Sequence, residues 1–342
     1  MNLFRVLFLS LLLFYLGLCH VVEARDLVFS PGFRTIGVWD EGEKIRLDLN
    51  VWYPTKVKPK QVYLKPWTLN IAHYAIPVSG RFPLIILSHD TVATRFSYHQ
   101  SAALFASMGF VVIAPEHQGD NLHHMNSLFK WQQLEQRIRE ISFLLDLAQK
   151  HEKLKSMVDM ERVGLLGFGT GASVALLLAG ALFDIEGFNN YCSHVPQSNM
   201  YCNAWSKKHV QNMIASLPME QISFRDSRIK AIGAVAPAYD FLFTPKVLQN
   251  IVAPLLLVET EKDLKQKIWG KHNIQEIFPD DIDFICIDKI DKRDFMSTCP
   301  SIYTRDLPDL CGSANEELRS AVHEEFNSKV IEFFLFQLGK KS

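Results

Sequence analysis

The sequence has no excess of charge of either sign. Its 342 residues include 36 lysines and arginines against 37 aspartates and glutamates, a formal net charge of −1, and no basic run stands out. Nucleic acids and anionic membrane surfaces bind concentrated positive charge, so we expect no nucleic-acid partner. The sequence also lacks internal repeats. After residue 24 it lacks any apolar stretch of the roughly 20 residues that a membrane-spanning helix requires.

Residues 1–24 have the layout of a secretory signal peptide. A positive charge at Arg5 precedes an almost wholly apolar stretch, and the segment ends on a small residue, Ala24. We expect cleavage after Ala24, which leaves 25–342 as one domain in the periplasm or outside the cell. A lipoprotein attachment at Cys19 and an uncleaved anchor are the alternatives.

The spacing of cysteines typical of metal sites is also missing. No C-x-x-C pair occurs, and we expect neither a metal nor a cofactor. Two locally spaced pairs, Cys192 with Cys202 and Cys299 with Cys311, indicate two small disulfide loops in an exported protein. The alternative is that all these thiols are free. Cys286 lies within an apolar run and is predicted to be a buried thiol.

Short apolar runs indicate buried strands. They lie at 82–87, 110–114, 163–166, 229–236, 254–259 and 283–287. Helical spacing of apolar residues predicts helices at 98–108, 131–148 and 172–179, and a final helix from a Ser313–Glu316 capping box through Leu338. Strands that alternate with helices imply an α/β fold with a mostly parallel central sheet flanked by helices.

Three further segments complete the organisation. Alternating apolar runs around the turn-rich DEGEK predict an antiparallel hairpin over 26–54. Residues 55–80 are expected to be irregular. Residues 183–228 are polar and hold the first cysteine pair, so they are interpreted as a small cap-like insertion over the sheet.

The most informative stretch lacks a serine. Glu161–Gly180 has the pattern of a strand, a glycine-rich turn and an apolar helix, which is the setting of the G-x-S-x-G nucleophile elbow. Gly169 stands at the serine position. Such a turn strains a non-glycine residue by about 1–3 kcal/mol, whereas glycine adopts it freely. Gly169 therefore keeps the turn and removes the atom that could attack a carbonyl.

Several segments, in order along the chain, carry a resemblance to a known family. They are GFRTIGVWDEGE, VWYPT, PLIILSHD, GFVVIAPEHQGDN, REISFLLDLA, DSRIKAIGAVAP and CPSI…LCGSA…VHEEFNSKVIEFF. From about Gly32 to Leu338 the chain resembles the α/β-hydrolase fold. Within that fold it is similar to the secreted predicted dienelactone hydrolases, which are related to the platelet-activating-factor acetylhydrolases.

The resemblance implies transfer of an acyl group from carboxylic esters or lactones to water. In the family a serine attacks, a histidine takes its proton and an aspartate orients the histidine. Position by position, the serine falls on Gly169, the acid on the retained Asp263, and the histidine on Asp294 in the segment KRDFM. Loss of a triad nucleophile removes on the order of 10⁶-fold of turnover, so impaired catalysis is expected.

The region expected to bind the oxyanion departs from the family as well. The family has His-Gly where this chain has His89 and Asp90, followed by Thr91. A carboxylate at Asp90 is expected to repel an oxyanion. Thr170 follows the elbow, at the position that normally supplies a backbone amide to the oxyanion.

Substitute groups are alternatives to the missing ones. Thr170 and Ser173 lie near the elbow and are alternative nucleophiles. His89 and His117 are interpreted as structural hydrogen-bonding side chains, although both follow predicted strand ends. Four carboxylates also follow strand ends on the same side and, with one or more of the histidines, are a candidate acidic pocket for a cation or a basic ligand: Asp90, Asp120, Asp263 and Asp294.

Three functions remain open from sequence. The first is a catalytically impaired member of the family that binds a small acyl or ester-like ligand. The second is an active carboxylic ester hydrolase with substituted groups, such as an aspartate that activates water. The third is a protein-binding module that uses 183–228.

Overall fold

The computed structural model describes most of the chain from Val28 onward. The described residues are 28–42, 44–184, 186–188, 191–196, 198–217, 222–267, 282–312 and 315–339. The expected signal peptide, 1–24, lies outside them. None of the helices in these ranges is long and apolar enough to cross a membrane.

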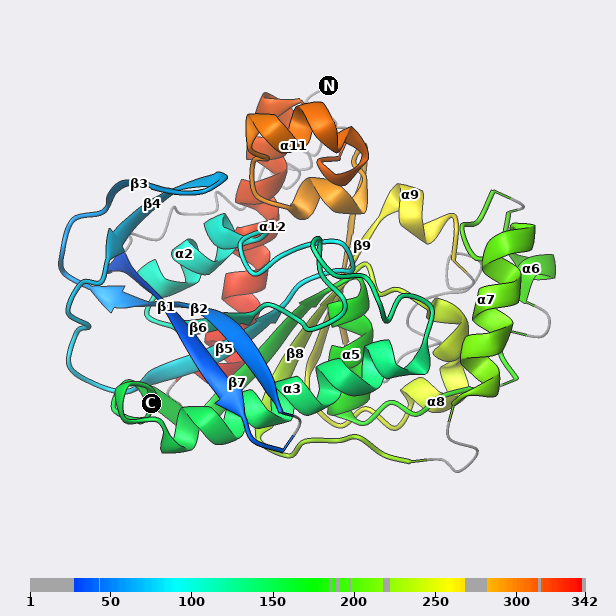
Figure 1. The fold of residues 1–342 in the computed structure, drawn as a ribbon, viewed down its shortest axis with the longest axis horizontal. Coiled ribbons are helices and arrows are strands. Elements are labelled where there is room, and N and C mark those ends of the chain that lie inside the picture. The colour runs from blue at the N-terminus through cyan, green and yellow to red at the C-terminus, as the bar shows by residue number, and fades with distance from the viewer. Residues whose placement is uncertain are drawn as a thin grey trace, which may run out of the picture.

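The described residues form one ten-stranded sheet (Figure 1). Its strands are β1 (Ser30–Asp40), β2 (Ile45–Thr55), β3 (Lys60–Leu64), β4 (Trp67–His73), β5 (Phe82–Ser88), β6 (Val111–Pro115), β7 (Val158–Phe168), β8 (Ile229–Val235), β9 (Leu255–Thr260) and β10 (Ile282–Ile287). Their order is β10-β9-β8-β7-β5-β6-β2-β1-β4-β3. All neighbours from β10 to β6 are parallel, which confirms the mostly parallel sheet. β1 and β2 form the predicted antiparallel hairpin.

Helices cover both faces of the sheet (Figure 1). They are α2 (His99–Ser107), α3 (Trp131–Lys150), α4 (Glu152–Lys155), α5 (Thr170–Ala179), α6 (Tyr191–His194), α7 (Ala204–Ala215), α8 (Pro245–Leu248), α9 (Glu261–Leu264), α11 (Ser301–Asp306) and α12 (Glu316–Leu338). Leu84 and Ile86 of β5 pack in a core with α3 and α5. Ile85 and Leu87 pack in a second core with α2 and α12. Successive side chains of a strand point to opposite faces, so these two cores lie on opposite sides of the sheet.

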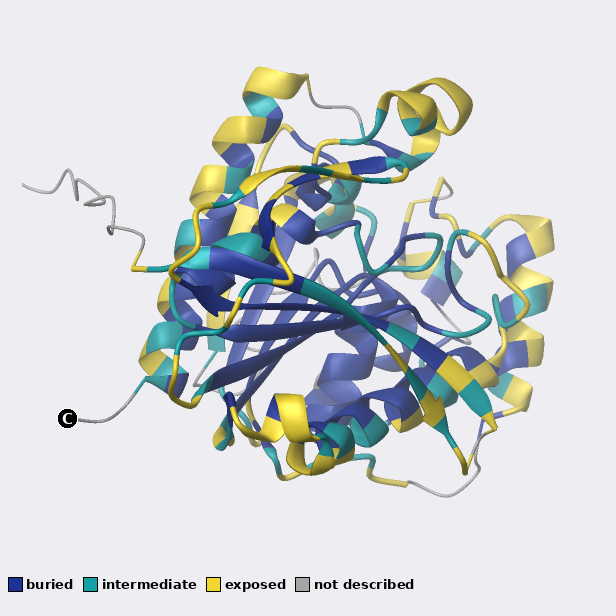
Figure 2. Cartoon of the chain, turned by 60° about the vertical axis from the view of Figure 1, so that its left-hand side comes forward, coloured by how far each residue is buried: buried dark blue, intermediate teal, exposed yellow. Residues whose placement is uncertain are grey.

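Burial of both faces explains the apolar runs in the sequence. The central strands are buried along almost their whole length, whereas the far end of the β1–β2 hairpin is exposed (Figure 2). A strand covered on both faces needs apolar residues at consecutive positions. The predicted strands and helices are therefore present, with bounds that shift by a few residues.

The expectation that 55–80 is irregular is wrong. This segment forms β3 and β4, which pair antiparallel, and β4 adds to β1. Trp67, Leu69 and Ile71 alternate along β4 and bury their side chains, with exposed polar residues between them. This period of two is the pattern of a half-buried strand, but it extends over only five residues.

Two smaller predictions are also corrected. Cys286 is an exposed free thiol, and β10 is the edge strand of the sheet that the described residues form. The N-cap of α12 is Asn315, whose side chain accepts a hydrogen bond from the Leu318 amide at 2.8 Å. Ser313, the predicted cap, lies outside the described residues.

The two predicted disulfides are confirmed. Cys192 pairs with Cys202 and Cys299 pairs with Cys311. The first closes a loop within 183–228, the predicted insertion, which carries the helices α6 and α7. The second joins the segment before α11 to the segment before α12.

Candidate functional site

The turn between β7 and α5 has the backbone of a nucleophile elbow. β7 ends at Phe168 and α5 begins at Thr170, and Gly169 between them has φ 53° and ψ −113°. A side chain is strained in this region, whereas glycine is not. A Cβ on Gly171 would overlap the backbone of Ser88, so the close approach of α5 to β5 requires glycine there too.

Asp90 occupies the space above this turn. It follows β5, which is the parallel neighbour of β7. A Cβ built on Gly169 would overlap the Asp90 carboxylate. The volume into which a side chain at the elbow would project is therefore filled by a side chain from the adjacent strand.

The same carboxylate accepts the two amides expected to form the oxyanion site. Asp90 Oδ1 lies 2.8 Å from the backbone nitrogen of Thr91 and 2.8 Å from that of Thr170. In an active elbow, the amide of the residue after the nucleophile and one from the turn after the neighbouring strand hold the developing negative charge. Here a fixed negative charge of the chain itself accepts both hydrogen bonds.

The ammonium group of Lys292 lies on the other side of this carboxylate. Its Nζ is 3.4 Å from Asp90 Oδ2, and its side chain is about a quarter exposed. The negative charge of Asp90 raises the pKa of Lys292 above its ordinary value, with a further contribution from Asp263. Lys292 is therefore a cation at neutral pH, and Asp90 has two amide donors on one oxygen and an ammonium group beside the other.

Asp294, the residue predicted at the histidine position, does not face the elbow. It is buried, its Oδ1 lies 3.0 Å from Arg319 Nη2, and its Oδ2 accepts the Asp291 amide at 2.8 Å. The cause is a 3₁₀ turn over Lys292–Phe295, in which Asp291 and Asp294 form a capping box. The turn places Lys292, two residues earlier, beside Asp90.

Asp263 lies in the same cavity as Asp90 and Lys292. Its carboxylate accepts a hydrogen bond from the Thr260 hydroxyl at 2.7 Å at the start of α9. Asp120 does not join them, because it is buried in an ion pair with Arg137 at 2.7 Å. The four carboxylates proposed as one acidic pocket are thus divided between separate places. Within the described residues, no group of three or more histidine, cysteine, aspartate or glutamate side chains is placed to hold a metal ion.

The alternative nucleophiles near the elbow are also engaged. The hydroxyls of Thr170 and Thr91 lie 2.7 Å apart, and Thr91 accepts a hydrogen bond from Gln133 at 2.8 Å. Ser173 is buried and donates to the carbonyl oxygen of Ala238 at 2.6 Å. Neither hydroxyl has a neighbouring histidine or carboxylate in these contacts that would act as its base.

A buried serine–histidine–glutamate chain lies beneath the elbow. Ser88 Oγ is 2.8 Å from His117 Nε2, and His117 Nδ1 is 2.6 Å from Glu140 Oε2. Burial raises the pKa of Glu140 to about 8 and lowers that of His117. These three side chains are buried and line neither cavity described below. His89 contacts the Asp90 carbonyl oxygen at 2.7 Å. Both histidines are therefore buried, hydrogen-bonded side chains, as predicted.

Asp90, Thr91, Thr170 and Lys292 line a cavity of about 1120 Å³. The loops that follow the parallel strands contribute to it, as does the predicted insertion. Most of its surface is apolar, and its apolar and aromatic lining residues include Val92, Leu122, Leu128, Phe129, Met200, Tyr201, Trp205, Met296 and Leu310. Crevices at the carboxyl ends of parallel strands are the usual ligand sites of open α/β sheets.

Four residues that line this cavity have strained backbones. Val92, Phe129, Ala236 and Tyr239 have φ between 46° and 65° without being glycine. For a β-branched or bulky residue this conformation is an outlier. Strain of this kind persists where the surrounding structure holds it, which is common at binding sites. The surrounding structure therefore holds the backbone that shapes this cavity.

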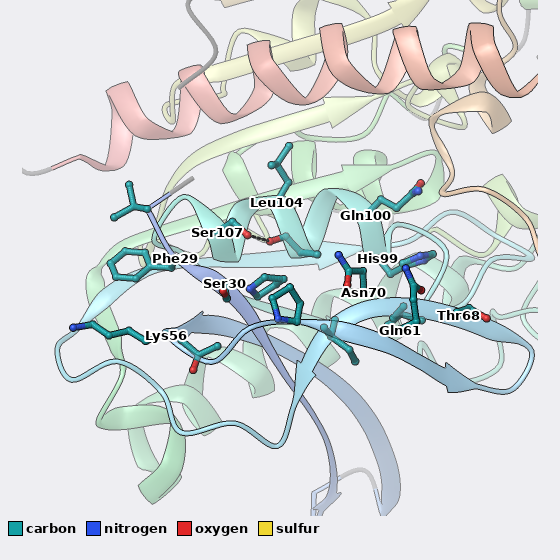
Figure 3. A pocket seen from close by; sticks show the side chains of 17 residues that line it. Phe29, Ser30, Lys56, Gln61, Thr68, Asn70, His99, Gln100, Leu104 and Ser107 are labelled. Carbon is teal, nitrogen blue, oxygen red and sulfur yellow. Dashed lines mark hydrogen bonds between the residues drawn. The ribbon is translucent and has the colours of Figure 1, made fainter. Parts of the chain in front are cut away.

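A second cavity, of about 820 Å³, shares no lining residue with the first. It lies between α2, β4 and the start of β1, with Phe29, His99 and Leu104 among its lining residues (Figure 3). Burial lowers the pKa of His99 to about 4, so this side chain is neutral at pH 7. The described residues that line this cavity include no carboxylate.

Comparisons with known proteins agree with this architecture. The family model described as platelet-activating factor acetylhydrolase, isoform II, matches residues 70–165. A ferulic acid esterase from Streptomyces cinnamoneus is similar over 94% of both chains, with a TM-score of 0.60 and 16% identity. This chain has the α/β-hydrolase fold. A dienelactone hydrolase from Anabaena variabilis is similar to this α/β-hydrolase-fold protein over 90% of this chain and 99% of its own, with a TM-score of 0.50 and 13% identity.

The family model does not cover the elbow turn. The family model ends at residue 165 and so does not reach Gly169, Asp263 or Lys292. No curated protein matches this α/β-hydrolase-fold protein in sequence.

Sequence reasoning missed two parts of the site. Lys292 was overlooked because the family segment placed Asp294 at the histidine position. The D-x-x-D spacing of Asp291 and Asp294 is the signal of a capped turn that could have identified the shift. The aromatic wall contributed by Tyr201 and Trp205 was also missed, because the polar composition of 183–228 gave no sign of it.

Proposed function

We propose that this α/β-hydrolase-fold protein is an exported, catalytically impaired relative of the dienelactone hydrolases and acetylhydrolases. In this proposal it binds a small acyl or ester-like molecule in the cavity above the elbow without hydrolysing it. The observation that carries the proposal is the position of Asp90, whose carboxylate fills the nucleophile space and accepts both amides.

The chemistry of ester hydrolysis explains why this position matters. A tetrahedral intermediate carries a negative oxygen that needs hydrogen-bond donors, and loss of one such donor costs about 10²–10³-fold in turnover. Thr91 and Thr170 offer their amides to Asp90 instead. An incoming oxyanion would have to compete with a carboxylate that is already in place and would be repelled by it. The same two amide donors and Lys292 withdraw electron density from Asp90, which makes it a poor nucleophile.

Hydrolysis of short-chain nitrophenyl esters by the mature protein tests the proposal. Wild type is expected to show no turnover above a denatured control. The triple variant Asp90→Gly/Gly169→Ser/Lys292→His vacates the amides, supplies a hydroxyl and places an imidazole in the cavity that Asp263 also lines. We expect it to exceed wild type by about 10²-fold or more.

A matched variant isolates the part played by Asp90. Gly169→Ser/Lys292→His retains the carboxylate and is expected to remain inert, because Asp90 still competes with the new hydroxyl for the space above the turn and with an oxyanion for the two amides. Turnover by wild type, or by this double variant at the level of the triple, would contradict the proposal.

Binding is measured separately with the uncharged fluorescent probe N-phenyl-1-naphthylamine. We expect saturable fluorescence enhancement, and loss of most of the affinity in Trp205→Ala, because Trp205 is more than half exposed beside the cavity. Tyr63→Ala is a matched control, since Tyr63 is similarly exposed but is not part of the lining. Absence of saturable binding would contradict a ligand-binding role.

A further inference from the structure

In the described lining of the 1120 Å³ cavity, each lysine and arginine side chain contacts a carboxylate of the chain. Lys262 Nζ lies 2.7 Å from Asp291 Oδ2, and Arg293 Nε lies 2.9 Å from Asp291 Oδ1. Lys267 Nζ lies 2.6 Å from Glu259 Oε1, in a pair with almost no exposure. The fourth, Lys292, faces Asp90 at 3.4 Å.

Acidic groups outnumber basic groups in this described lining. Six aspartates face four cations there: Asp90, Asp240, Asp263, Asp291, Asp306 and Asp309 against Lys262, Lys267, Lys292 and Arg293. The walls between them are mainly apolar, with aromatic rings from Phe129, Tyr201 and Trp205. A bound anion would thus lie in a partly desolvated, net negative site whose cations have partners. An unpaired charge in such surroundings is strongly unfavourable.

Asp90 is the central group in this arrangement. An elbow of this kind offers two amide donors to an anion, and Lys292 adds a positive charge beside them. Without Asp90, these three donors would form a carboxylate-binding site. With Asp90 in place, the chain supplies its own carboxylate to them.

We propose that Asp90 is a built-in anion that makes this cavity select uncharged apolar ligands, such as fatty alcohols and intact esters, over carboxylates. The inference rests on the proposed ligand-binding function and names the ligand class. It assigns Asp90 the role of setting specificity through charge, in addition to blocking the elbow. The cavity then holds an uncharged ester and excludes the acid that hydrolysis of that ester would release.

Competition for the bound probe tests this selectivity. N-phenyl-1-naphthylamine is bound to the mature protein at pH 7.5 and displaced by 1-dodecanol or by dodecanoate, each below its aggregation concentration. The two competitors have the same chain length and differ in the charge of the headgroup. Wild type is expected to bind dodecanol about tenfold or more tightly than dodecanoate.

Variants at Asp90 test whether its charge causes this selectivity. Asp90→Asn keeps an oxygen for the two amides, removes the charge and leaves Lys292 without its carboxylate. Dodecanoate is expected to bind this variant about tenfold more tightly than wild type, with dodecanol unchanged. Asp90→Asn/Lys292→Met should lose that gain. Asp288→Asn is the matched control, because it removes an exposed carboxylate that does not line the cavity.

The outcomes separate the two proposals. Failure of the probe to bind wild type overturns the ligand-binding function, and the inference with it. Probe binding with equal displacement by dodecanol and dodecanoate overturns the inference alone. An unchanged preference in Asp90→Asn also overturns it. If circular dichroism shows that Asp90→Asn does not fold, Lys292→Met in the wild-type background is the deciding variant. It must lower the affinity for dodecanoate further and leave the affinity for dodecanol unchanged.

Discussion

A single carboxylate determines which residues the elbow accepts. Gly169 has a backbone conformation that strains other residues, and its missing Cβ leaves room for Asp90. Glycine is thus required at this position for two reasons. The two substitutions that distinguish this elbow from an active one are coupled in space, although 79 positions separate them in the sequence.

That coupling predicts the result of a double-mutant cycle. Gly169→Ser alone is expected to lower the free energy of unfolding by about 3 kcal/mol or more, from backbone strain and overlap with Asp90. The loss in Asp90→Gly/Gly169→Ser should be at least about 1 kcal/mol smaller than the sum of the two single losses, because the overlap is gone. Urea denaturation of wild type, both single variants and the double variant measures the coupling. Additive effects would show that the two side chains do not compete for one space.

His99 gives a pH dependence with a definite sign. Its pKa is about 4 in the folded protein and about 6.5 in an unfolded chain, so the unfolded state takes up the proton first as the pH falls. Stability is therefore lost between pH 6.5 and pH 4, by about 3 kcal/mol at pH 4.

Comparison with His99→Gln isolates this contribution from those of other buried histidines. On going from pH 7 to pH 4, wild type should lose about 3 kcal/mol more than the variant in urea denaturation. Parallel pH curves for the two proteins would show that His99 does not carry this effect.

At the scale of elements, the sequence predicted what depends on local pattern. The buried strands and the long helices have apolar runs or helical spacing that a short window detects. β4 was missed because its alternation covers only Trp67 to Ile71, and its pairing with β1 joins distant segments. The elbow turn was predicted from its glycines. Its occupation by Asp90 was not, because that depends on β5 and β7 ending side by side.

Within the site, the 3₁₀ turn that follows β10 was also not predicted from local pattern. A family segment aligned by neighbouring residues placed Asp294 at the histidine position. The 3₁₀ turn over Lys292–Phe295 instead directs Asp294 toward Arg319 and places Lys292 beside Asp90. The direction of a side chain within a single turn cannot be inferred from the alignment of a short segment.

The first disulfide is expected to hold the insertion over the cavity. It closes a loop with a sequence separation of 10, for which the chain-entropy model gives about 2–3 kcal/mol. Cys192→Ser/Cys202→Ser should lower the melting temperature and weaken probe binding, because Tyr201 adjoins Cys202 and lines the cavity. Cys299→Ser/Cys311→Ser removes a loop of similar size beside another lining residue, Leu310, and shows whether that side of the cavity responds in the same way. Unchanged probe affinity in the first variant would show that the disulfide does not shape the cavity.

At the scale of the whole molecule, the predicted signal peptide and the two disulfides lead to one expectation about maturation. Expressed with its first residues in an exporting host, the chain should yield a protein that begins at Arg25. Its intact mass should be lower than that of the reduced chain by the four hydrogens that two disulfides remove. Mass spectrometry before and after reduction measures both properties. A mass that retains residues 1–24 would contradict cleavage, and no change on reduction would contradict the disulfides.

The strand order also sets a schedule for folding during synthesis. β5 pairs with β6 on one side and with β7 on the other, and β7 ends at Phe168, 80 residues after the end of β5. At translation rates of about 5–20 residues per second, about 4–16 s pass between the synthesis of β5 and the synthesis of its partner strand β7. Folding of this sheet is consequently limited by the arrival of distant strands. The apolar runs of the central strands, β5 among them, are the segments most in need of protection from aggregation in that interval.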